Sequence, residues 1–304
     1  MDISNFFVEN AGNTCYIDSL LMGLFYDSSR SEELLCKTLK NPNALAIYLQ
    51  EYIKENFINL VRNNKSVIFD DIEMIRTMCF QLGWRQNALA DEYTNQQDVN
   101  EFYTFLMDIF ENEQIMISRN TISEGSSDKI DIGKDESIPF IPLSLPENQT
   151  SITIKDLLHT WLYDNVSDLK RNVNTQKGNE EQMVKGLNTY SIVNSPYLFC
   201  VAINRFNNYG IRIQTDVIIQ KKISPYNKDI ICANKWDFHA AICHRGETNK
   251  SGHYYTLLSS NGKWYIFDDL EIPCMREIQM DDKEATNLIK KECTFLIYRL
   301  PKFH

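Results

Sequence analysis

The chain of 304 residues is 43% hydrophobic and 12% aromatic, which is enough apolar material for a sizeable core. Its formal net charge of −10 argues against nucleic acid and anionic membranes as partners, because both attract basic surfaces. No stretch reaches the roughly 20 apolar residues that span a bilayer, and residues 1–10 do not resemble a secretory signal, so we expect an intracellular protein of the cytoplasm or nucleus.

The first third of the sequence has the periodicity of helices. Apolar residues recur every three or four positions from Tyr16 to Phe25, after Pro42, and again in "QQDVNEFYTFLMDIF", residues 96–110. Each stripe predicts a helix with one face against a core.

Helical periodicity weakens after residue 112. The polar segments 117–137 and 166–186 predict surface loops or a reduced β extension, which flank a short ordered unit at 151–164. Six later runs are rich in β-branched and aromatic residues and predict strands at 197–206, 211–220, 238–245, 253–260, 263–269 and 293–300. Helices followed by strands predict an α+β protein.

Eight cysteines are spread through the chain without a single CxxC pair. Zinc sites usually take ligands at short spacing, and disulfide frameworks are typical of short secreted chains, so the sequence predicts neither. We expect most of these cysteines to be small buried side chains, and we expect no metal and no cofactor.

Cys15 has neighbours that suit a nucleophile. It lies in "NAGNTCYIDSLL", residues 10–21, at the expected start of a helix, where free N–H groups and the helix dipole favour a thiolate. Asn10 could direct its amide at an oxyanion formed beside the sulfur. The alternative is a buried structural cysteine, which is the better interpretation unless a base lies nearby.

The candidate base is His253, in "GHYYTLLSSNGKWYIFDD", residues 252–269. The Asn-Gly pair at 261–262 predicts a two-residue hairpin turn, whose register puts Asp268 on the face of His253 and Asp269 on the other face. Asp269 could replace Asp268 in part if the strand ends early and the chain rotates at Phe267. We expect Asp268 to accept a hydrogen bond from Nδ1, so that Nε2 faces the sulfur.

Two other histidines are weaker candidates for the base. His244 lies at the edge of a loop, and no carboxylate follows His239 at a position that a hairpin fixes. The structural alternative for His253 is an ordinary strand histidine with a solvated turn after it.

Four segments together resemble the ubiquitin-specific protease family. Residues 10–21 resemble its cysteine box, residues 252–269 its histidine box, residues 96–110 the segment between them, and residues 195–206 the strand that precedes the palm sheet. The resemblance implies a single catalytic domain with a papain-like cysteine protease fold. It would have a helical thumb at about 1–112, a shortened fingers region at about 113–190 and an antiparallel β palm at about 191–304.

The resemblance also implies an activity and a role for each site residue. The enzyme would be a thiol hydrolase that cleaves the (iso)peptide bond after the C-terminal glycine of ubiquitin. Cys15 would be the nucleophile, His253 the base, Asp268 the orienting residue and Asn10 the oxyanion donor.

A second set of residues would bind the ubiquitin tail, Leu-Arg-Leu-Arg-Gly-Gly, and consists of Gln97, Asp98, Glu101, Gly252 and Tyr254. Carboxylates at positions 98 and 101 suit the arginines of the tail, and the loop 246–252 could act as a lid. Alternatively, Asp98 only caps its helix and Glu101 is solvated. The partners would be ubiquitin and ubiquitinated proteins, and the enzyme would be a monomer.

Two departures from the family pattern affect these expectations. Asp18-Ser19 stands where the family usually has Asn-Ser, and the CxxC pairs that bind zinc in many fingers regions are missing, which predicts zinc-free fingers. The alternative functions are a protease for another ubiquitin-like modifier, a papain-like transferase and an inactive ubiquitin-binding relative. The intact Cys15, His253, Asp268 and Asn10 argue against the last of these.

Overall fold

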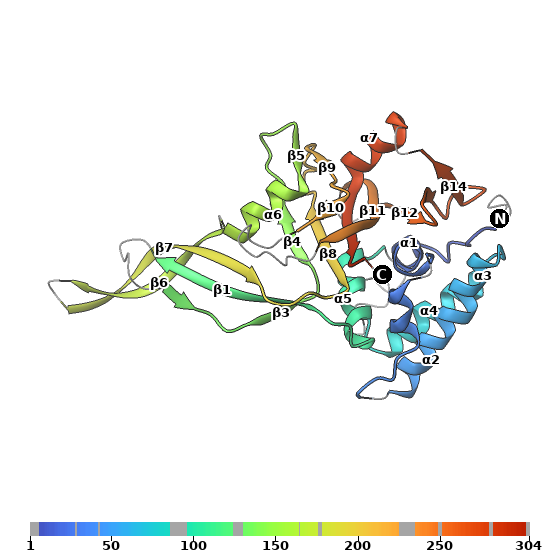
Figure 1. Cartoon of the computed structure of the whole chain (residues 1–304), viewed down its shortest axis with the longest axis horizontal. Coiled ribbons are helices and arrows are strands. Elements are labelled where there is room, and N and C mark those ends of the chain that lie inside the picture. The colour runs from blue at the N-terminus through green and yellow to red at the C-terminus, as the bar shows by residue number, and fades with distance from the viewer. Residues whose placement is uncertain are drawn as a thin grey trace.

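The computed structural model describes residues 6–27, 29–41, 43–85, 96–123, 130–163, 165–175, 178–224, 235–248, 251–279 and 282–301. Helices occupy one end of the molecule, a large sheet lies at its centre, and a long narrow sheet projects from the other side (Figure 1). None of the helices in these ranges combines the length and the apolar character that crossing a membrane requires.

The helical end is built from five helices. They are α1 (Cys15–Phe25), α2 (Ala44–Ile53), α3 (Asn59–Arg62), α4 (Phe69–Gln81) and α5 (Val99–Ile109). A 3-10 turn at Arg30–Leu35 follows α1, and a π-helical turn at Lys54–Ile58 joins α2 to α3. The helices expected after Cys15, after Pro42 and within 96–110 are therefore confirmed, whereas α4 was not expected.

The projecting sheet corresponds to the expected fingers segment. Its strands are β1 (Ile115–Ser123), β2 (Ile130–Ile132), β3 (Glu136–Ile138), β6 (Asn165–Thr175) and β7 (Gly178–Ile192). They pair antiparallel in the order β2-β1-β7-β6, with β3 also beside β1. The loop interpretation of 117–137 and 166–186 is thus wrong within the described residues, and the β extension is present. Few apolar residues alternate along β6 and β7, so the sequence carries only a weak strand signal.

The central sheet contains the later strands of the chain. Their bounds are β4 (Ile141–Ser144), β8 (Leu198–Asn204), β10 (Lys222–Ile223), β11 (Trp236–Thr248), β12 (Ser251–Ser260), β13 (Lys263–Phe267), β14 (Met275–Ile278) and β15 (Cys293–Arg299). The order is β14-β13-β12-β11-β15-β8-β4, with β10 also beside β11. All neighbours pair antiparallel except β4 and β8, which are parallel.

Helices and a small second sheet flank the central sheet. Helix α6 (Ile154–Tyr163) packs near the base of β7, where the rings of Trp161 and Tyr190 stack with centroids 4.5 Å apart. Helix α7 (Lys283–Glu292) leads directly into β15. Strands β5 (Ser151–Thr153) and β9 (Asp216–Ile218) form a short parallel pair, so only part of the strand expected at 211–220 is present.

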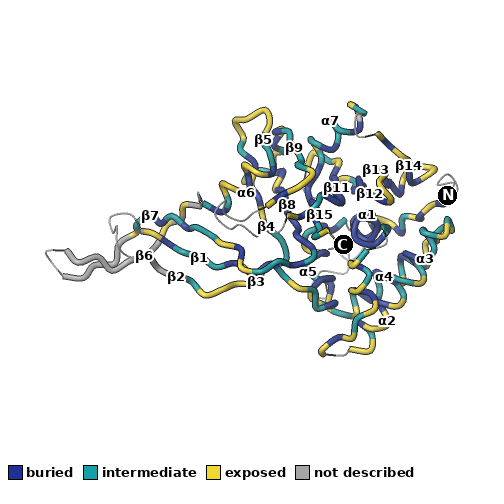
Figure 2. Tube along the Cα trace, viewed as in Figure 1, coloured by how far each residue is buried: buried dark blue, intermediate teal, exposed yellow. Residues whose placement is uncertain are grey.

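Both faces of the central sheet are buried along most of β8, β11 and β15. In β11 and β15, Ala240, Ile242, Phe295 and Ile297 face the core shared with the helical end. The residues between them belong to a second core on the other face. Because both faces are covered, these strands read as continuous apolar runs and not as an alternation (Figure 2).

Helix α1 lies inside the first core and is buried along its whole length (Figure 2). It is tied to the central sheet by Thr256 in β12, which donates its hydroxyl hydrogen to the backbone carbonyl oxygen of Ser19 at 2.8 Å. On the opposite side, the ring of Tyr16 meets Phe102 of α5 edge to face, with centroids 5.1 Å apart. These contacts fix the start of α1 beside strand β12.

Candidate active site

The backbone turns sharply immediately before α1. Gly12 and Asn13 both have positive φ angles, 77° and 58°, a conformation that glycine and asparagine tolerate best. The guanidinium of Arg76 in α4 donates to the carbonyl oxygens of Ala11 and Gly12 at 3.0 and 2.8 Å. The loop that leads to Cys15 is therefore held by a helix that the sequence did not reveal.

Cys15 occupies the first position of α1 and is only 2% exposed. Burial raises the pKa of its thiol to about 12, and the backbone N–H of Tyr254 in β12 is its main opposing hydrogen-bond donor. The expectation of a thiolate at rest is wrong, because desolvation outweighs the effect of the helix start. The thiol is neutral and needs a base.

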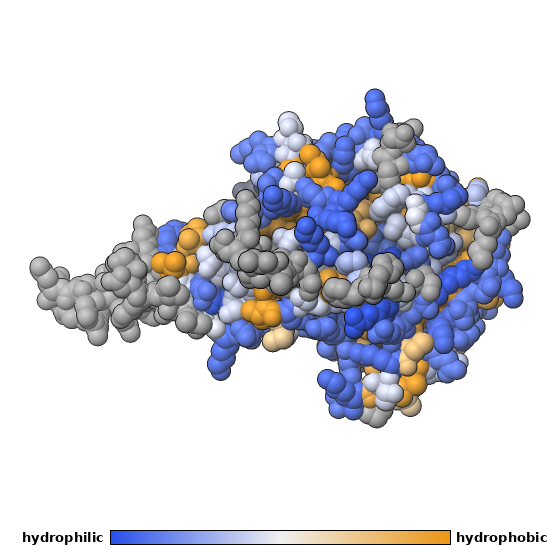
Figure 3. All heavy atoms as spheres, in the orientation of Figure 1, coloured by the Kyte–Doolittle hydropathy of each residue, from blue (hydrophilic) through white to orange (hydrophobic). Residues whose placement is uncertain are grey.

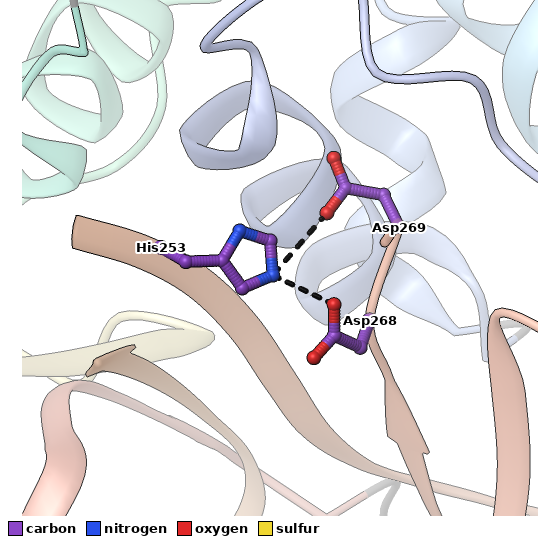
Figure 4. Close-up of side chains that lie close together, drawn as sticks. All are labelled: His253, Asp268 and Asp269. Atoms are coloured by element: carbon purple, nitrogen blue, oxygen red, sulfur yellow. Dashed lines mark hydrogen bonds and ion pairs between the residues drawn. The ribbon is translucent and has the colours of Figure 1, made fainter. Parts of the chain in front are cut away.

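His253, the residue before Tyr254, has the expected carboxylate partner. Its Nε2 atom lies 2.6 Å from Oδ1 of Asp268 and 3.5 Å from Oδ1 of Asp269 (Figure 4). The expected assignment of the ring nitrogens is therefore wrong. Nε2 faces the carboxylates, and Nδ1 lies on the ring edge turned away from them (Figure 4).

The hairpin formed by β12 and β13 brings Asp268 and His253 to the same end of the two strands. Ser260 pairs with Lys263 across the turn, as expected, and the pairing continues to Thr256 and Phe267. The pairing with β12 ends there, whereas the N–H of Asp268 donates to the carbonyl oxygen of Cys274 at 2.8 Å and continues the register of β13 with β14. The chain turns after this point, so the expectation that Asp269 points away is wrong.

The two carboxyl groups differ in their electrostatic environment. Burial alone would raise the pKa of Asp268, but the hydrogen bond from His253 and the charge of that ring lower it below its usual value. Burial raises the pKa of Asp269, although His253 and Asn10 oppose the change. Asp268 is the group that holds a negative charge most readily at His253.

Asn10 is also part of this cluster. Its Nδ2 atom donates to Oδ2 of Asp269 at 2.6 Å, and its Oδ1 atom accepts from the N–H of Thr14 at 3.5 Å. Asp18 in α1 is fully buried, and the neighbouring Asp269 adds to the effect of burial in raising the pKa of Asp18. Sequence reasoning noted the unusual Asp18 but gave it no partner, because the contact joins distant parts of the chain.

The same cluster is the place where a metal would find ligands. One atom each from His253, Asp268 and Asp269 lies within 4.8 Å of the others. A metal ion bound to Nε2 of His253 would break the hydrogen bond from this nitrogen to Asp268. The hydrogen bonds among these side chains already account for the geometry of the cluster. The seven described cysteines are all free, and all but Cys36 are buried, while Cys232 lies outside the described residues.

A cavity of about 350 Å³ opens between α5 and the central sheet. Its lining includes Asp98, Phe140, His244 and Tyr254. The Oδ1 atom of Asp98 accepts from the N–H groups of Asn100 and Glu101 at 2.7 and 3.2 Å, so this residue caps α5 and also reaches the cavity.

Three other residues expected to bind the tail, Gln97, Glu101 and Gly252, are not part of the cavity lining. Gln97 is buried, while Glu101 is exposed, pairs with Arg85 and does not line the cavity. Gly252 lies against His244, and a Cβ atom there would come within 2.5 Å of the His244 ring and of the Arg245 carbonyl oxygen. Residues 249 and 250 of the expected lid lie outside the described residues.

His244 lines the cavity, a position that the sequence analysis did not assign to it. It pairs with Tyr254 across β11 and β12, and their rings lie 4.8 Å apart beside the cavity. Burial, Arg212 and His253 lower the pKa of His244 to about 4, so the ring is neutral at pH 7. The signal was present in the glycines at 246 and 252, which allow the hairpin to close around an imidazole.

A family model described as ubiquitin carboxyl-terminal hydrolase matches residues 8–298 of the chain. Ubiquitin carboxyl-terminal hydrolase 15 of Saccharomyces cerevisiae is 25% identical over 308 residues, which cover 86% of this chain and 22% of that protein. Ubiquitin carboxyl-terminal hydrolase 36 of Drosophila grimshawi is 22% identical over 312 residues, which cover 91% of this chain and 24% of that protein. The chain thus spans less than a quarter of the length of these two relatives.

Solved structures share the architecture. The SAGA Ubp8/Sgf11/Sus1/Sgf73 DUB module bound to ubiquitin aldehyde matches with a TM-score of 0.70 and 15% identity, covering 98% of this chain and 70% of that chain. The same module bound to monoubiquitin matches with a TM-score of 0.69 and 14% identity, covering 100% of this chain and 71% of that chain. This likeness confirms the expected α+β fold.

Proposed function

Because the chain belongs to the family of ubiquitin carboxyl-terminal hydrolases, we propose that it is a cysteine-type deubiquitinase that cleaves the (iso)peptide bond after the C-terminal glycine of ubiquitin. One observation carries the proposal. His253 is hydrogen-bonded to Asp268, and the residue after His253 in β12, Tyr254, donates its backbone N–H to the Cys15 sulfur. A buried thiol, a histidine and a carboxylate are the groups that thiol hydrolysis requires.

The mechanism begins with proton transfer from the Cys15 thiol to Nδ1 of His253, which leaves a thiolate to attack the carbonyl carbon of the ubiquitin glycine. Asp268 stabilises the resulting imidazolium through its bond to Nε2. The tetrahedral intermediate collapses when Nδ1–H protonates the leaving amine, and a thioester to Cys15 remains. Water, deprotonated by Nδ1, then hydrolyses the thioester and restores the thiol.

Asn10 is the proposed donor to the oxyanion. An amide nitrogen carries two hydrogens, and one of them is bonded to Asp269 at 2.6 Å. The second hydrogen is the one that would meet the developing negative charge, with the first bond fixing the orientation of the amide.

The cavity lined by Asp98, His244 and Tyr254 is the proposed path of the ubiquitin tail. Asp98 in its lining offers a carboxylate to an arginine of the tail. Gln97 and Gly252 would support the residues that form its walls, while Glu101 would contribute charge from outside the cavity.

The projecting sheet would contact the body of ubiquitin. Ile122, Leu187 and Val166 are direct cross-strand partners on one face of β1, β7 and β6, and Val166 is 60% exposed. Hydrophobic side chains are visible on this sheet in an otherwise mainly hydrophilic surface (Figure 3). An apolar strip of this kind favours a folded protein as partner.

The organisation proposed from these features is one catalytic domain, with a thumb at about 1–112, fingers at about 113–190 and a palm at about 191–304. The enzyme would act as a monomer, inside a cell in the cytoplasm or nucleus, on ubiquitinated proteins.

Modifier proteins that carry a C-terminal electrophile test the proposal. We expect the ubiquitin probe to label the native protein and the Cys36→Ala control, whose lost thiol is the exposed one, but not Cys15→Ala. If another ubiquitin-like modifier labelled the protein and ubiquitin did not, that modifier would be the substrate in place of ubiquitin. Labelling of Cys15→Ala would reject Cys15 as the nucleophile.

A further inference from the structure

The contact between Asp18 and Asp269 joins two buried acidic side chains beside the catalytic residues. Asp18 lies on the inner face of α1 with no exposed surface, and Asp269 is 9% exposed. The two carboxyl groups lie close enough to act on each other: Asp269 raises the pKa of Asp18, and Asp18 as a hydrogen-bond partner lowers that of Asp269. Two carboxylates have no hydrogen to share, so a hydrogen bond between them requires one of the pair to be protonated.

The neighbouring hydrogen bonds locate the proton. The hydroxyl of Thr14 accepts from the N–H of Ala11 at 2.9 Å and donates to Oδ2 of Asp18 at 3.1 Å. Oδ2 of Asp269 accepts from Asn10. The remaining oxygens, Oδ1 of Asp18 and Oδ1 of Asp269, are buried and have no hydrogen-bond partner within the described part of the chain. They are the two atoms left to share the proton.

Asp269 has the better environment for the negative charge. It accepts from Asn10 and lies 3.5 Å from Nε2 of His253, whereas Asp18 has only the Thr14 hydroxyl as a further donor. Burial raises the pKa of Asp18 well above its ordinary value, and the charge of Asp269 raises it further. The other ionisable groups that act on the pair are Arg76 in α4, Cys15 in α1, Asp268 after β13 and Cys274 before β14.

We propose that Asp18 is a positioning residue that stays protonated at neutral pH and donates its Oδ1 hydrogen to Asp269, thereby holding the Asp269 carboxylate on the amide of Asn10. Loss of the proton would place two like charges in contact and release Asp269 from its position. The arrangement of Asn10 would then be lost with it. The effect on catalysis rests on the proposed function, whereas the location of the proton does not.

NMR of isotope-labelled aspartate side chains in the inactive Cys15→Ala protein measures the proton directly. We expect one carboxyl carbon, identified by its loss in Asp18→Asn, to keep the chemical shift of a neutral acid from about pH 5 to 9. An Asp18 signal that titrates as an ordinary aspartate would overturn the proposal, whether or not the native protein cleaves ubiquitin.

Turnover of a ubiquitin–fluorophore substrate tests the consequence. Asp18→Asn keeps an N–H donor for Asp269 and an acceptor for Thr14, so we expect a kcat close to native. Asp18→Ala removes both, and we expect kcat to fall about 10- to 100-fold with little change in KM. Equal losses in the two variants would reject the donor role. If Asp18→Ala does not fold, the NMR result and the activity of Asp18→Asn still decide the question.

Discussion

His253 presents Nε2 to Asp268, and 2.6 Å separates this nitrogen from Oδ1 of the carboxylate. A carboxylate at that distance keeps the hydrogen on Nε2 and leaves Nδ1 as the basic nitrogen. The histidine is thus prepared to accept a proton before the substrate binds, which a neutral and buried thiol at Cys15 requires.

The two aspartates after β13 should contribute unequally to catalysis. Asp268→Asn loses the charge that stabilises the imidazolium, and we expect kcat to fall about 100-fold. Asp269→Asn keeps an oxygen that can accept from Asn10 but removes the charge that strengthens this hydrogen bond, so we expect a smaller fall in kcat. Turnover of a ubiquitin–fluorophore substrate by both variants, with folding checked by circular dichroism, measures the difference. A larger loss in Asp269→Asn would mean that the orienting carboxylate is Asp269.

Asp98→Asn should weaken substrate binding without disturbing α5. Asparagine caps a helix about as well as aspartate, so the bonds to the N–H groups of residues 100 and 101 persist while the charge is lost. We expect KM for ubiquitin substrates to rise about 10-fold with kcat nearly unchanged. Asp108→Asn removes the same charge from an exposed position of α5 and serves as the control. Equal KM values for the two variants would place the tail elsewhere.

His239 should make the fold sensitive to mild acid. Burial and Arg299 lower its pKa to about 3, from an ordinary value near 6.5. Below pH 6.5 the imidazole of His239 binds a proton in the unfolded chain but not in the folded protein. His239 therefore reduces the free energy of unfolding as the pH falls from 6.5 towards 3. The loss is at most about 1.4 kcal/mol for each pH unit in that window.

Urea unfolding at about pH 7.5 and 5 measures this effect. We expect the native protein to lose more stability between the two conditions than His239→Gln, which cannot titrate. His159→Gln, a change at an exposed position of α6, should behave as the native protein does. Identical pH dependence in all three proteins would show that His239 accepts a proton while folded.

Purified protein should contain no stoichiometric zinc. Residues 113–190 include no cysteine, and the projecting sheet is held by its strand pairing and by packing such as that of Trp161 on Tyr190. A chelator should therefore change neither the activity nor the melting temperature. Elemental analysis that finds one zinc per chain would contradict this prediction.

Strong local patterns carried the successful sequence predictions. The stripe from Val99 to Phe110 and the Asn-Gly turn at 261–262 each specify a structure from neighbouring residues alone. Helix α4 was missed because its apolar stripe is interrupted by acidic and polar residues, including the arginine that binds the loop before Cys15.

Tertiary contacts decided the details that the sequence could not predict. The extrapolated register failed beyond Phe267 because the pairing of β12 with β13 ends there and the Asp269 side chain is held by Asn10. The proton proposed between Asp18 and Asp269 depends on a contact between the first helix and the end of a late hairpin. No local pattern predicts that contact.

Strand β15 lies between β11 and β8 inside the large sheet, although it is the last strand in the described residues. Until residues 293–299 are present, β11 and β8 have no strand between them with which both can pair. The turn before Cys15 depends on the same strand, since its anchor at Asp269 follows β13 on the β11 side of the sheet. We therefore expect a chain shortened so that β15 is lost to be unable to assemble the candidate active site.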